Sequence, residues 1–298
     1  DLVDGERHPG HRQHRLGRVD GERAQACALS PDEQHGFGHL ARVPQGSDRA
    51  DPRTVPGMTT IWTLLQQRRR AAAGAPVVTF VDADGARVEL SATSLENAAA
   101  KTANALADEF DLEAGARVAL LLPVHWQRAA WLAGCWTAGC EVRLPSGPDD
   151  ADDADLLVTT ADALPANRSR PPVAAVSLHP LGLTVPGSVP AGVLDATVVV
   201  RSAPDAFLGV PPAGTSAAIE VGGSVIDQAD VVDLAQTKAA AWGLAPGGRL
   251  LVGPGTDPLD AWLAALAVPL AATASVVLVD GEHDLDRLAA QERVTATL

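Results

Sequence analysis

The chain has 298 residues, of which 46% are hydrophobic and 20% are charged. This usage is ordinary for one or two globular domains, and it excludes a fibre, a disulfide scaffold and disorder throughout. The net charge is −14, with 23 Lys and Arg residues against 37 Asp and Glu residues. A negative field of this size repels phosphate backbones, so we do not expect nucleic acid as a partner.

The first 57 residues differ from the rest of the chain. They contain five of the eight histidines, including His8, His11 and His14, and no stretch with helical or strand periodicity. We expect residues 1–57 to be disordered, or to be a non-native upstream extension that precedes a start at Met58. Closely spaced imidazoles can share a metal ion, but disorder is the favoured interpretation, and no apolar segment predicts a secretory signal.

Two further features bear on cellular location. Cys135 and Cys140 have no His-rich or Cys-rich surroundings to complete a metal site, so we expect reduced core cysteines in a cytoplasmic protein. The uncharged stretch 261–279 is long enough to span a bilayer, but it is rich in alanine and contains Pro269. We therefore predict a helix followed by a strand there, and no membrane partner.

From Met58 onward the pattern predicts alternating helices and strands. The apolar run 118–122 is typical of a strand that is buried on both faces of a parallel sheet. With the next helix and strand it forms a βαβ unit. The elements predicted in this half are a helix over 61–70 capped by Thr60, a hairpin of 77–81 and 87–90, a helix from Ser94, strand 118–122, helix 126–138 and strand 141–144.

The helix predicted over residues 126–138 carries three tryptophans at intervals of five residues. Trp126, Trp131 and Trp136 therefore spread around the helix and do not form one stripe. A helix that is apolar on nearly all sides is usually buried, so we expect these side chains to pack in the core.

The middle of the chain has weaker patterns. Five of the seven residues 149–155 are aspartate, but the glycine and glutamate of a calcium loop are absent, so we expect a solvated loop. A strand follows at 156–159. Residues 165–217 are rich in Pro, Gly and Ser, and we predict strands joined by turns there.

The last third predicts a second βαβ unit. A helix over 227–242 ends at a Pro-Gly-Gly turn and leads to a strand over 249–252. Asp257 then caps a helix that has Pro258 at its first position, and a strand follows at 274–279.

The order of these elements resembles the amino-terminal part of the AMP-dependent synthetase and ligase superfamily, the adenylate-forming acyl-CoA synthetases. The residues that carry the resemblance are the segment GARVALLLP at 115–123, the turn WTAGC at 136–140, helix 227–242 with LAPGGR at 244–249, and RVT at 293–295. The resemblance implies an α/β fold over residues 58–298, with αβα layers and a mostly parallel sheet. It is closest to a short actinobacterial variant.

The resemblance also implies which parts hold ATP. Relatives that make acyl-adenylates have a phosphate loop rich in Ser, Thr and Gly that ends in Pro-Lys-Gly, because backbone N–H groups and a cation must hold the phosphates. The corresponding segment 214–224 reads GTSAAIEVGGS, has no lysine and contains Glu220, whose charge opposes triphosphate binding. Neither Lys101 nor Lys238, the only lysines, matches the catalytic lysine of the family, and the chain ends before the family's adenine-binding, ribose-binding and hinge motifs.

The sequence contains three weaker candidate sites, and for each of them a purely structural role is favoured. Gly253-Pro254-Gly255 is half of a dinucleotide fingerprint, but Pro258 replaces the third glycine and Asp257 adds negative charge, so an ordinary turn is favoured. A decayed phosphate loop at Thr215, Ser216, Gly222 and Gly223 is weighed against a plain loop, which is favoured. No spacing selects His125, His179 or His283 as a general base.

We therefore assign no catalytic, cofactor-binding or metal-binding residue. The leading hypothesis is a catalytically decayed acyl-CoA synthetase-like domain with a binding or interaction role, including contact with a protein partner or a second copy. The alternative is an active ligase component that binds ATP, magnesium and a carboxylic acid and is completed by another chain. A nucleotide-binding regulatory module is a third hypothesis.

Overall fold

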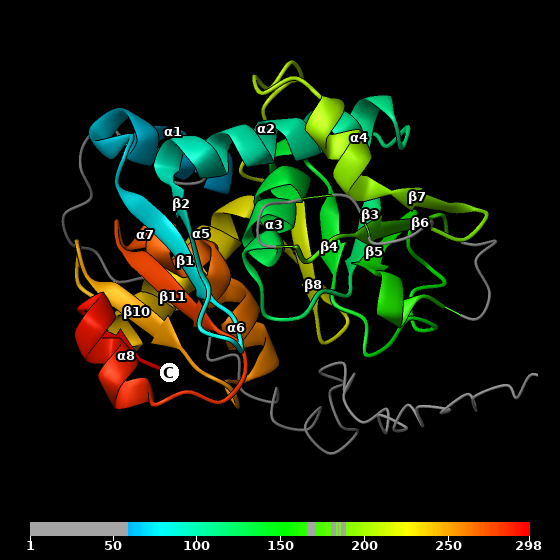
Figure 1. The fold of residues 1–298 in the computed structure, drawn as a ribbon. Coiled ribbons are helices and arrows are strands. Elements are labelled where there is room, and N and C mark those ends of the chain that lie inside the picture. Colours follow the sequence, from blue (N-terminus) through cyan, green and yellow to red (C-terminus); the bar gives the residue numbers. More distant parts are fainter. Residues whose placement is uncertain (1–58, 166–170, 180–182, 184, 186–188) are drawn as a thin grey trace, which may run out of the picture.

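The computed structural model describes residues 59–165, 171–179, 183, 185 and 189–298. The strands form two sheets, and helices lie between them (Figure 1). One continuous cluster of buried apolar side chains joins the inner faces of both sheets to these helices. The interpretation of residues 1–57 lies outside the described part of the chain, as do residues 166–170 and parts of 180–188 in the Pro-rich middle.

The first sheet has seven strands in the order β7-β6-β5-β3-β4-β8-β9. All neighbouring pairs are parallel except β8 and β9, which form an antiparallel hairpin. The strands are β3 (Arg117–Leu120), β4 (Glu141–Arg143), β5 (Leu156–Thr160), β6 (Val173–Val176), β7 (Val193–Asp195), β8 (Ala217–Val221) and β9 (Ser224–Asp227).

The second sheet has five strands in the order β12-β10-β11-β1-β2. Its β1 and β2 form the predicted hairpin, and β1 also pairs in parallel with β11 from the other end of the described chain. The strands are β1 (Pro76–Val81), β2 (Arg87–Ser91), β10 (Arg249–Val252), β11 (Ser275–Val279) and β12 (Ala296–Thr297).

Both predicted βαβ units are present, and the α/β fold class with mostly parallel sheets is confirmed. Parallel β3 and β4 flank α3, and parallel β10 and β11 flank α6 and α7. The division into two sheets was not predicted. The helices are α1 (Ile61–Ala72), α2 (Ala92–Asp108), α3 (Trp126–Ala138), α4 (Ala196–Ser202), α5 (Gln228–Ala241), α6 (Pro258–Ala265), α7 (Ala267–Ala271) and α8 (Leu285–Glu292), with a 3-10 turn at Ala161–Ala163.

The helix ends follow the capping residues. Thr60 caps α1 by accepting a bond from the Thr63 N–H, as predicted. The predicted start of α2 at Ser94 is wrong: Ser91 is the cap, its hydroxyl accepts the Ser94 N–H at 3.1 Å, and the helix begins at Ala92. Among the helices, the short α4 in the Pro-rich middle and α8 were missed.

Helix α3 is buried without interruption from Gln127 to Thr137, which confirms that it packs on all sides. The Trp136 indole N–H donates to the carbonyl oxygen of Ala218 in β8 at 2.7 Å. The Gln228 side chain at the start of α5 donates to the carbonyl oxygen of Trp136 at 3.2 Å. These bonds join α3 to the β8–β9 hairpin and to the helix that follows it.

The stretch 261–279 folds as most of α6, then α7 and then β11, as predicted. Within the described residues, none of the helices combines the length and the apolar character needed to cross a bilayer.

An ion-pair network fastens α8 to the five-stranded sheet. The Glu292 carboxylate accepts from Arg87 Nε at 2.7 Å and from Arg249 Nη2 at 2.5 Å, and Arg249 also donates to the Thr79 hydroxyl at 2.8 Å. Burial favours the neutral form of Glu292, but the hydrogen bonds from the two guanidinium groups outweigh it and hold its pKa below 4.5. The same hydrogen bond to Glu292 raises the pKa of Arg87.

Gly134 allows the close approach of α3 to α2. A Cβ atom at this position would overlap with Cβ and Cγ2 of Thr102. We predict that Gly134→Ala lowers the free energy of unfolding by about 1–3 kcal/mol, although alanine is the better helix former. The matched control is Gly74→Ala, which has open space around it and should change stability by less than about 0.5 kcal/mol. Equal stability of the two variants in urea unfolding would show that α2 and α3 are not in this close contact.

We predict that Glu292→Gln destabilises the chain at neutral pH and that this deficit shrinks in acid. A carboxyl group with a lowered folded-state pKa stabilises the protein above its unfolded pKa, and the contribution is lost as pH falls through the folded value. Urea unfolding at pH 7 and below about pH 4 measures the change. Exposed Glu282, which has no ion pair among the described residues, supplies the control variant Glu282→Gln. A deficit that is independent of pH would exclude the network as its source.

Candidate functional site

The segment 214–224, expected to be a loop, is mostly strand. Strands β8 and β9 pair from Ala217↔Asp227 to Val221↔Ser224, and only Gly222 and Gly223 lie between them. Their φ angles are 58° and 81°, the left-handed region that a two-residue hairpin turn requires and that glycine adopts without strain. The segment that the resemblance matched to a phosphate loop is therefore a tight hairpin turn.

Glu220 holds this turn closed. Its Oε1 accepts the backbone N–H of Gly223 at 2.8 Å, and its Oε2 pairs with Arg143 Nε at 2.6 Å. The carboxylate is thus partnered, and the charge repulsion expected from the sequence is offset in part by Arg143. The sequence did not predict a second effect of this carboxylate. It accepts the Gly223 N–H, so this N–H of the turn is no longer free to donate to another group.

Three aspartates of 149–155 are engaged with nearby groups. Asp153 pairs with Arg143 at 2.7 Å and with Arg117 at 3.6 Å. Asp155 accepts the backbone N–H of Arg117 at 2.8 Å, and Asp150 accepts that of Ser146 at 3.1 Å. In the described part of the chain, no three His, Cys, Asp or Glu side chains lie where they would hold a metal ion together.

The turn at Gly253-Pro254-Gly255 leads into α6 as predicted. The Asp257 carboxylate caps the helix by accepting the Asp260 N–H at 3.1 Å, so a negative group already occupies the helix N-terminus. Asp260 in turn pairs with Lys238 at 2.6 Å. This arrangement favours an ordinary strand-to-helix turn over a nucleotide site.

The other lysine has a structural position. Lys101 in α2 donates from Nζ to the carbonyl oxygens of Arg201 at 3.2 Å and Ala203 at 2.6 Å. It therefore fastens the carboxyl end of α4 to α2. Asn104, one turn further along α2, holds the next segment by donating to the carbonyl oxygens of Pro204 and Ala206.

The histidines and cysteines singled out from the sequence have structural roles, and the Cys140 N–H donates to the Cys135 carbonyl oxygen at 2.8 Å. His125 caps α3 by accepting the Gln127 N–H at Nδ1, and burial lowers its pKa to about 4, so it is neutral at physiological pH. Nε2 of His283 lies 2.9 Å from the carbonyl oxygen of Asp82. Cys135 and Cys140 are fully buried free thiols, as predicted, and burial raises the pKa of Cys140 to about 12.

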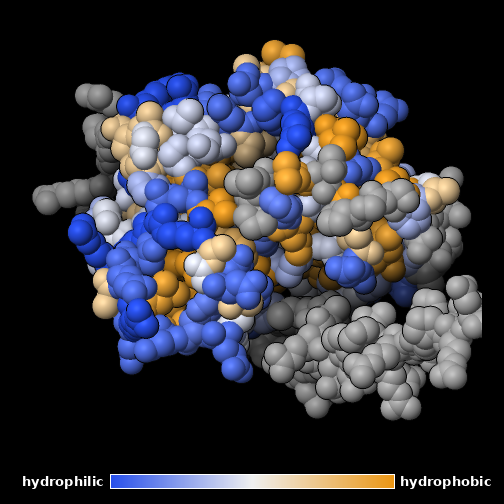
Figure 2. All heavy atoms as spheres, in the orientation of Figure 1, coloured by the Kyte–Doolittle hydropathy of each residue, from blue (hydrophilic) through white to orange (hydrophobic). Residues whose placement is uncertain are grey.

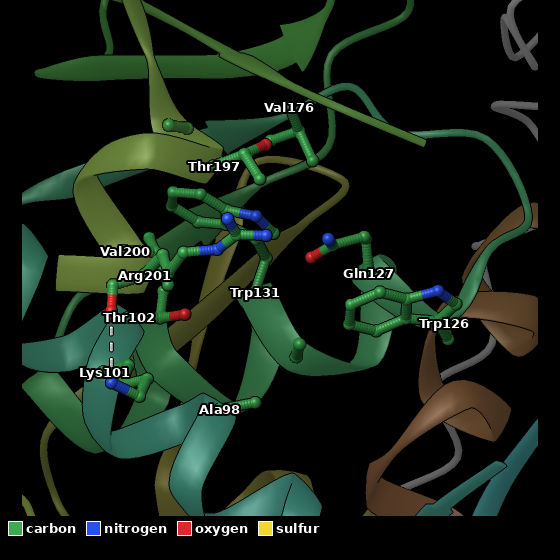
Figure 3. A pocket seen from close by; sticks show the side chains of 12 residues that line it. Ala98, Lys101, Thr102, Trp126, Gln127, Trp131, Val176, Thr197, Val200 and Arg201 are labelled. Atoms are coloured by element: carbon green, nitrogen blue, oxygen red, sulfur yellow. Dashed lines mark hydrogen bonds between the residues drawn. The ribbon is translucent and has the colours of Figure 1, made fainter. Parts of the chain in front are cut away.

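The structure adds a cavity that the sequence did not indicate. It has a volume of about 140 Å³ and lies between α2, α3, α4 and the end of β6 (Figure 3). Trp126, Trp131 and Gln127 line it from α3, and Val176 and Val200 line it from β6 and α4. The spacing of the tryptophans predicted a buried helix, but the space beside them is created by α4, which was missed.

A second hollow of about 350 Å³ lies between α1, α2 and residues 205–207. Its walls include Arg69 and Glu96, which form an ion pair with each other. The two charged groups therefore satisfy one another across this hollow.

Comparison with known proteins gives the family. A TIGR03089 family protein of Mycobacterium tuberculosis is 36% identical over 255 residues, which cover 81% of this chain and 100% of the relative. The chain belongs to the TIGR03089 family. No family model matches this TIGR03089 chain.

Solved structures share the fold of this TIGR03089 chain. An acyl-CoA synthetase of Brucella canis is similar with a TM-score of 0.66 and 21% identity, covering 82% of this chain and 48% of that one. A Mycobacterium tuberculosis fatty acyl CoA synthetase gives 0.61 and 18%, covering 79% and 48%. MbtA of Mycobacterium smegmatis gives 0.62 and 22%, covering 80% and 47%.

The resemblance to the amino-terminal part of the adenylate-forming synthetases is therefore confirmed at the level of fold. The TIGR03089 chain spans about half the length of these solved synthetases. At 18–22% identity the likeness concerns the fold alone.

We predict that Arg143 and Glu220 stabilise the hairpin as a coupled pair. In a double-mutant cycle with Arg143→Ala and Glu220→Ala, we expect a coupling free energy of about 1 kcal/mol, because both groups are only partly exposed. The control cycle uses Arg117 and Asp153, which are more exposed and 3.6 Å apart, and its coupling should be close to zero. Chemical denaturation of the four variants of each cycle measures both values. A coupling of zero for Arg143 and Glu220 would mean that the pair does not hold the turn.

Proposed function

We propose that this protein is an adenylate-forming synthetase-like domain that has lost ATP-dependent adenylation and retains a binding or interaction role in the cytoplasm. The observation that carries the proposal is the closed β8–β9 turn. Gly222 and Gly223 are the whole connection between the strands, and the Gly223 N–H already donates to Glu220. A phosphate loop needs backbone N–H groups that are free to donate to the phosphates.

The positions of the cations also support the proposal. Lys238 is paired with Asp260, and Lys101 donates to two carbonyl oxygens of the α4 end. Arg143, the cation beside the turn, is shared between Glu220 and Asp153. A triphosphate at the turn would have to displace these carboxylates and would meet their charge.

The alternative function is an active ligase component that binds ATP, magnesium and a carboxylic acid and is completed by another chain. The fold shared with acyl-CoA synthetases over about 80% of this chain favours it. The two functions differ in whether the chain itself binds ATP.

We predict that the full 298-residue chain shows no ATP–pyrophosphate exchange with magnesium and a panel of carboxylic acids. The physical reason is that the N–H donor and the cation beside the turn are both engaged by carboxylates. Isothermal titration with magnesium–ATP should likewise give no heat of binding. An active acyl-CoA synthetase serves as the positive control for both assays.

Exchange that follows the protein peak through size-exclusion chromatography would overturn the proposal and favour the ligase component. Arg143→Ala then gives a further check, since exchange at this turn would depend on the cation next to it. Glu220→Gln removes the opposing charge and, if the turn is the site, should increase that exchange.

A further inference from the structure

The cavity between α2, α3 and α4 has fixed walls. Asp195 caps α4 by accepting the N–H groups of Thr197 and Val198, and Lys101 fastens its other end to α2. The Thr197 hydroxyl accepts the Ser177 N–H at 3.0 Å, which ties α4 to the residue after β6. The space of about 140 Å³ is therefore formed before any ligand arrives.

Most of the wall surface is apolar. Two indole rings, Trp126 and Trp131, line it together with Val176 and Val200, and Gln127 lies between the two rings (Figure 3). An engineered apolar cavity of about 150 Å³ is large enough to hold benzene. Aromatic rings stack on or meet the edge of other rings with a gain beyond simple burial. The volume and the indoles together favour a single aromatic ring as the occupant.

One polar side chain points into this space. Gln127 is only 9% exposed, and its amide extends into the cavity, where no hydrogen-bond partner for it exists among the described residues (Figure 3). The Trp126 indole N–H is also buried without a partner in that part of the chain. The Gln127 amide is thus available to hydrogen-bond a ligand oxygen or hydroxyl.

The charges around the cavity limit the ligand further. Lys101 and Arg201 are among its lining residues, and no aspartate or glutamate is. Although the chain has a net charge of −14, the charged residues that line the cavity are positive. The cavity can therefore bind a ligand with an anionic oxygen as well as one with a neutral oxygen. The surface near α4 is also apolar, with Leu194 and Val198 each nearly half exposed, and Figure 2 shows hydrophobic side chains gathered there.

We infer that this cavity is a binding site for a small molecule with one aromatic ring and one oxygen substituent, which hydrogen-bonds to the Gln127 side-chain amide. This inference rests on the proposed binding role and places that role in the cavity. Pyrophosphate exchange tests the turn at Gly222 and Gly223, which is a different place. Failure of the aromatic probes to bind would therefore leave the exchange result unaffected.

The test uses phenol and benzoate as probes with the full chain, by isothermal titration and by the shift of the thermal unfolding midpoint. We expect at least one probe to bind with one-to-one stoichiometry and to raise the midpoint. Tighter binding of phenol would indicate that the site prefers a neutral hydroxyl, and tighter binding of benzoate would indicate that it prefers a carboxylate. If neither probe gives a heat of binding or a shift of the unfolding midpoint, the inference is overturned.

Two variants locate the binding. Ala98→Leu extends a side chain into the cavity from α2 and should weaken binding by about tenfold or more, which is 1.4 kcal/mol or more. The matched control Ala107→Leu makes the same change at an exposed position of the same helix and should leave affinity unchanged. Equal binding by both variants would place the ligand elsewhere and overturn the inference.

Gln127→Leu separates a ligand-binding amide from a structural one. Because the amide has no partner in the empty cavity, this variant should be at least as stable as the parent chain while losing affinity for the probe. Lower stability of Gln127→Leu with unchanged affinity would mean that the amide serves the fold, and would contradict its role in binding.

Discussion

Helix α3 has almost no surface that meets solvent, and the arrangement of both sheets depends on this constraint. It is buried from Gln127 to Thr137 because α1, α2, α6, β1 and β4 all pack against it. A helix in this position needs apolar or small side chains in every direction. Alanines, tryptophans and Gly134 supply them, and Gly134 in particular lets α2 come close.

Burial on all sides also requires that the polar groups of α3 find partners inside the protein. The Trp136 indole N–H donates to the backbone of β8, and the Gln228 side chain donates to the backbone of α3. Buried Arg128 donates to the Leu122 carbonyl oxygen, and its guanidinium carbon lies 4.2 Å from the centre of the Trp262 ring. Each of these bonds joins α3 to a different element. Among the described residues, the Trp126 indole N–H is buried without a partner, and the Gln127 amide faces the cavity.

The sequence predicted the elements with long periodic patterns and missed those defined by tertiary contacts. Helix 126–138 was predicted with its observed bounds because its composition alone requires burial. Helix α4 has only seven residues in a Pro-rich region, and Lys101 and Asn104 from α2 hold its end and the following segment. The two sheets depend on pairings such as Val78 with Val276, which no local pattern encodes. The cavity beside α4 was missed for the same reason.

The β8–β9 hairpin is held in the fold by its strands and not by its turn. The contacts that integrate it into the protein lie on the strands and their outer ends: Ile219 pairs with Val142, the Ala218 carbonyl oxygen accepts the Trp136 indole, and the Gln228 N–H donates to the Ser216 carbonyl oxygen at 2.9 Å. The turn itself contributes to none of these contacts. The length and sequence of this turn can therefore vary while the sheet and α5 keep their places. The fold shared with the synthetases consequently carries no information about adenylation by this chain, which under the proposed function depends on the few atoms at the tip of this hairpin.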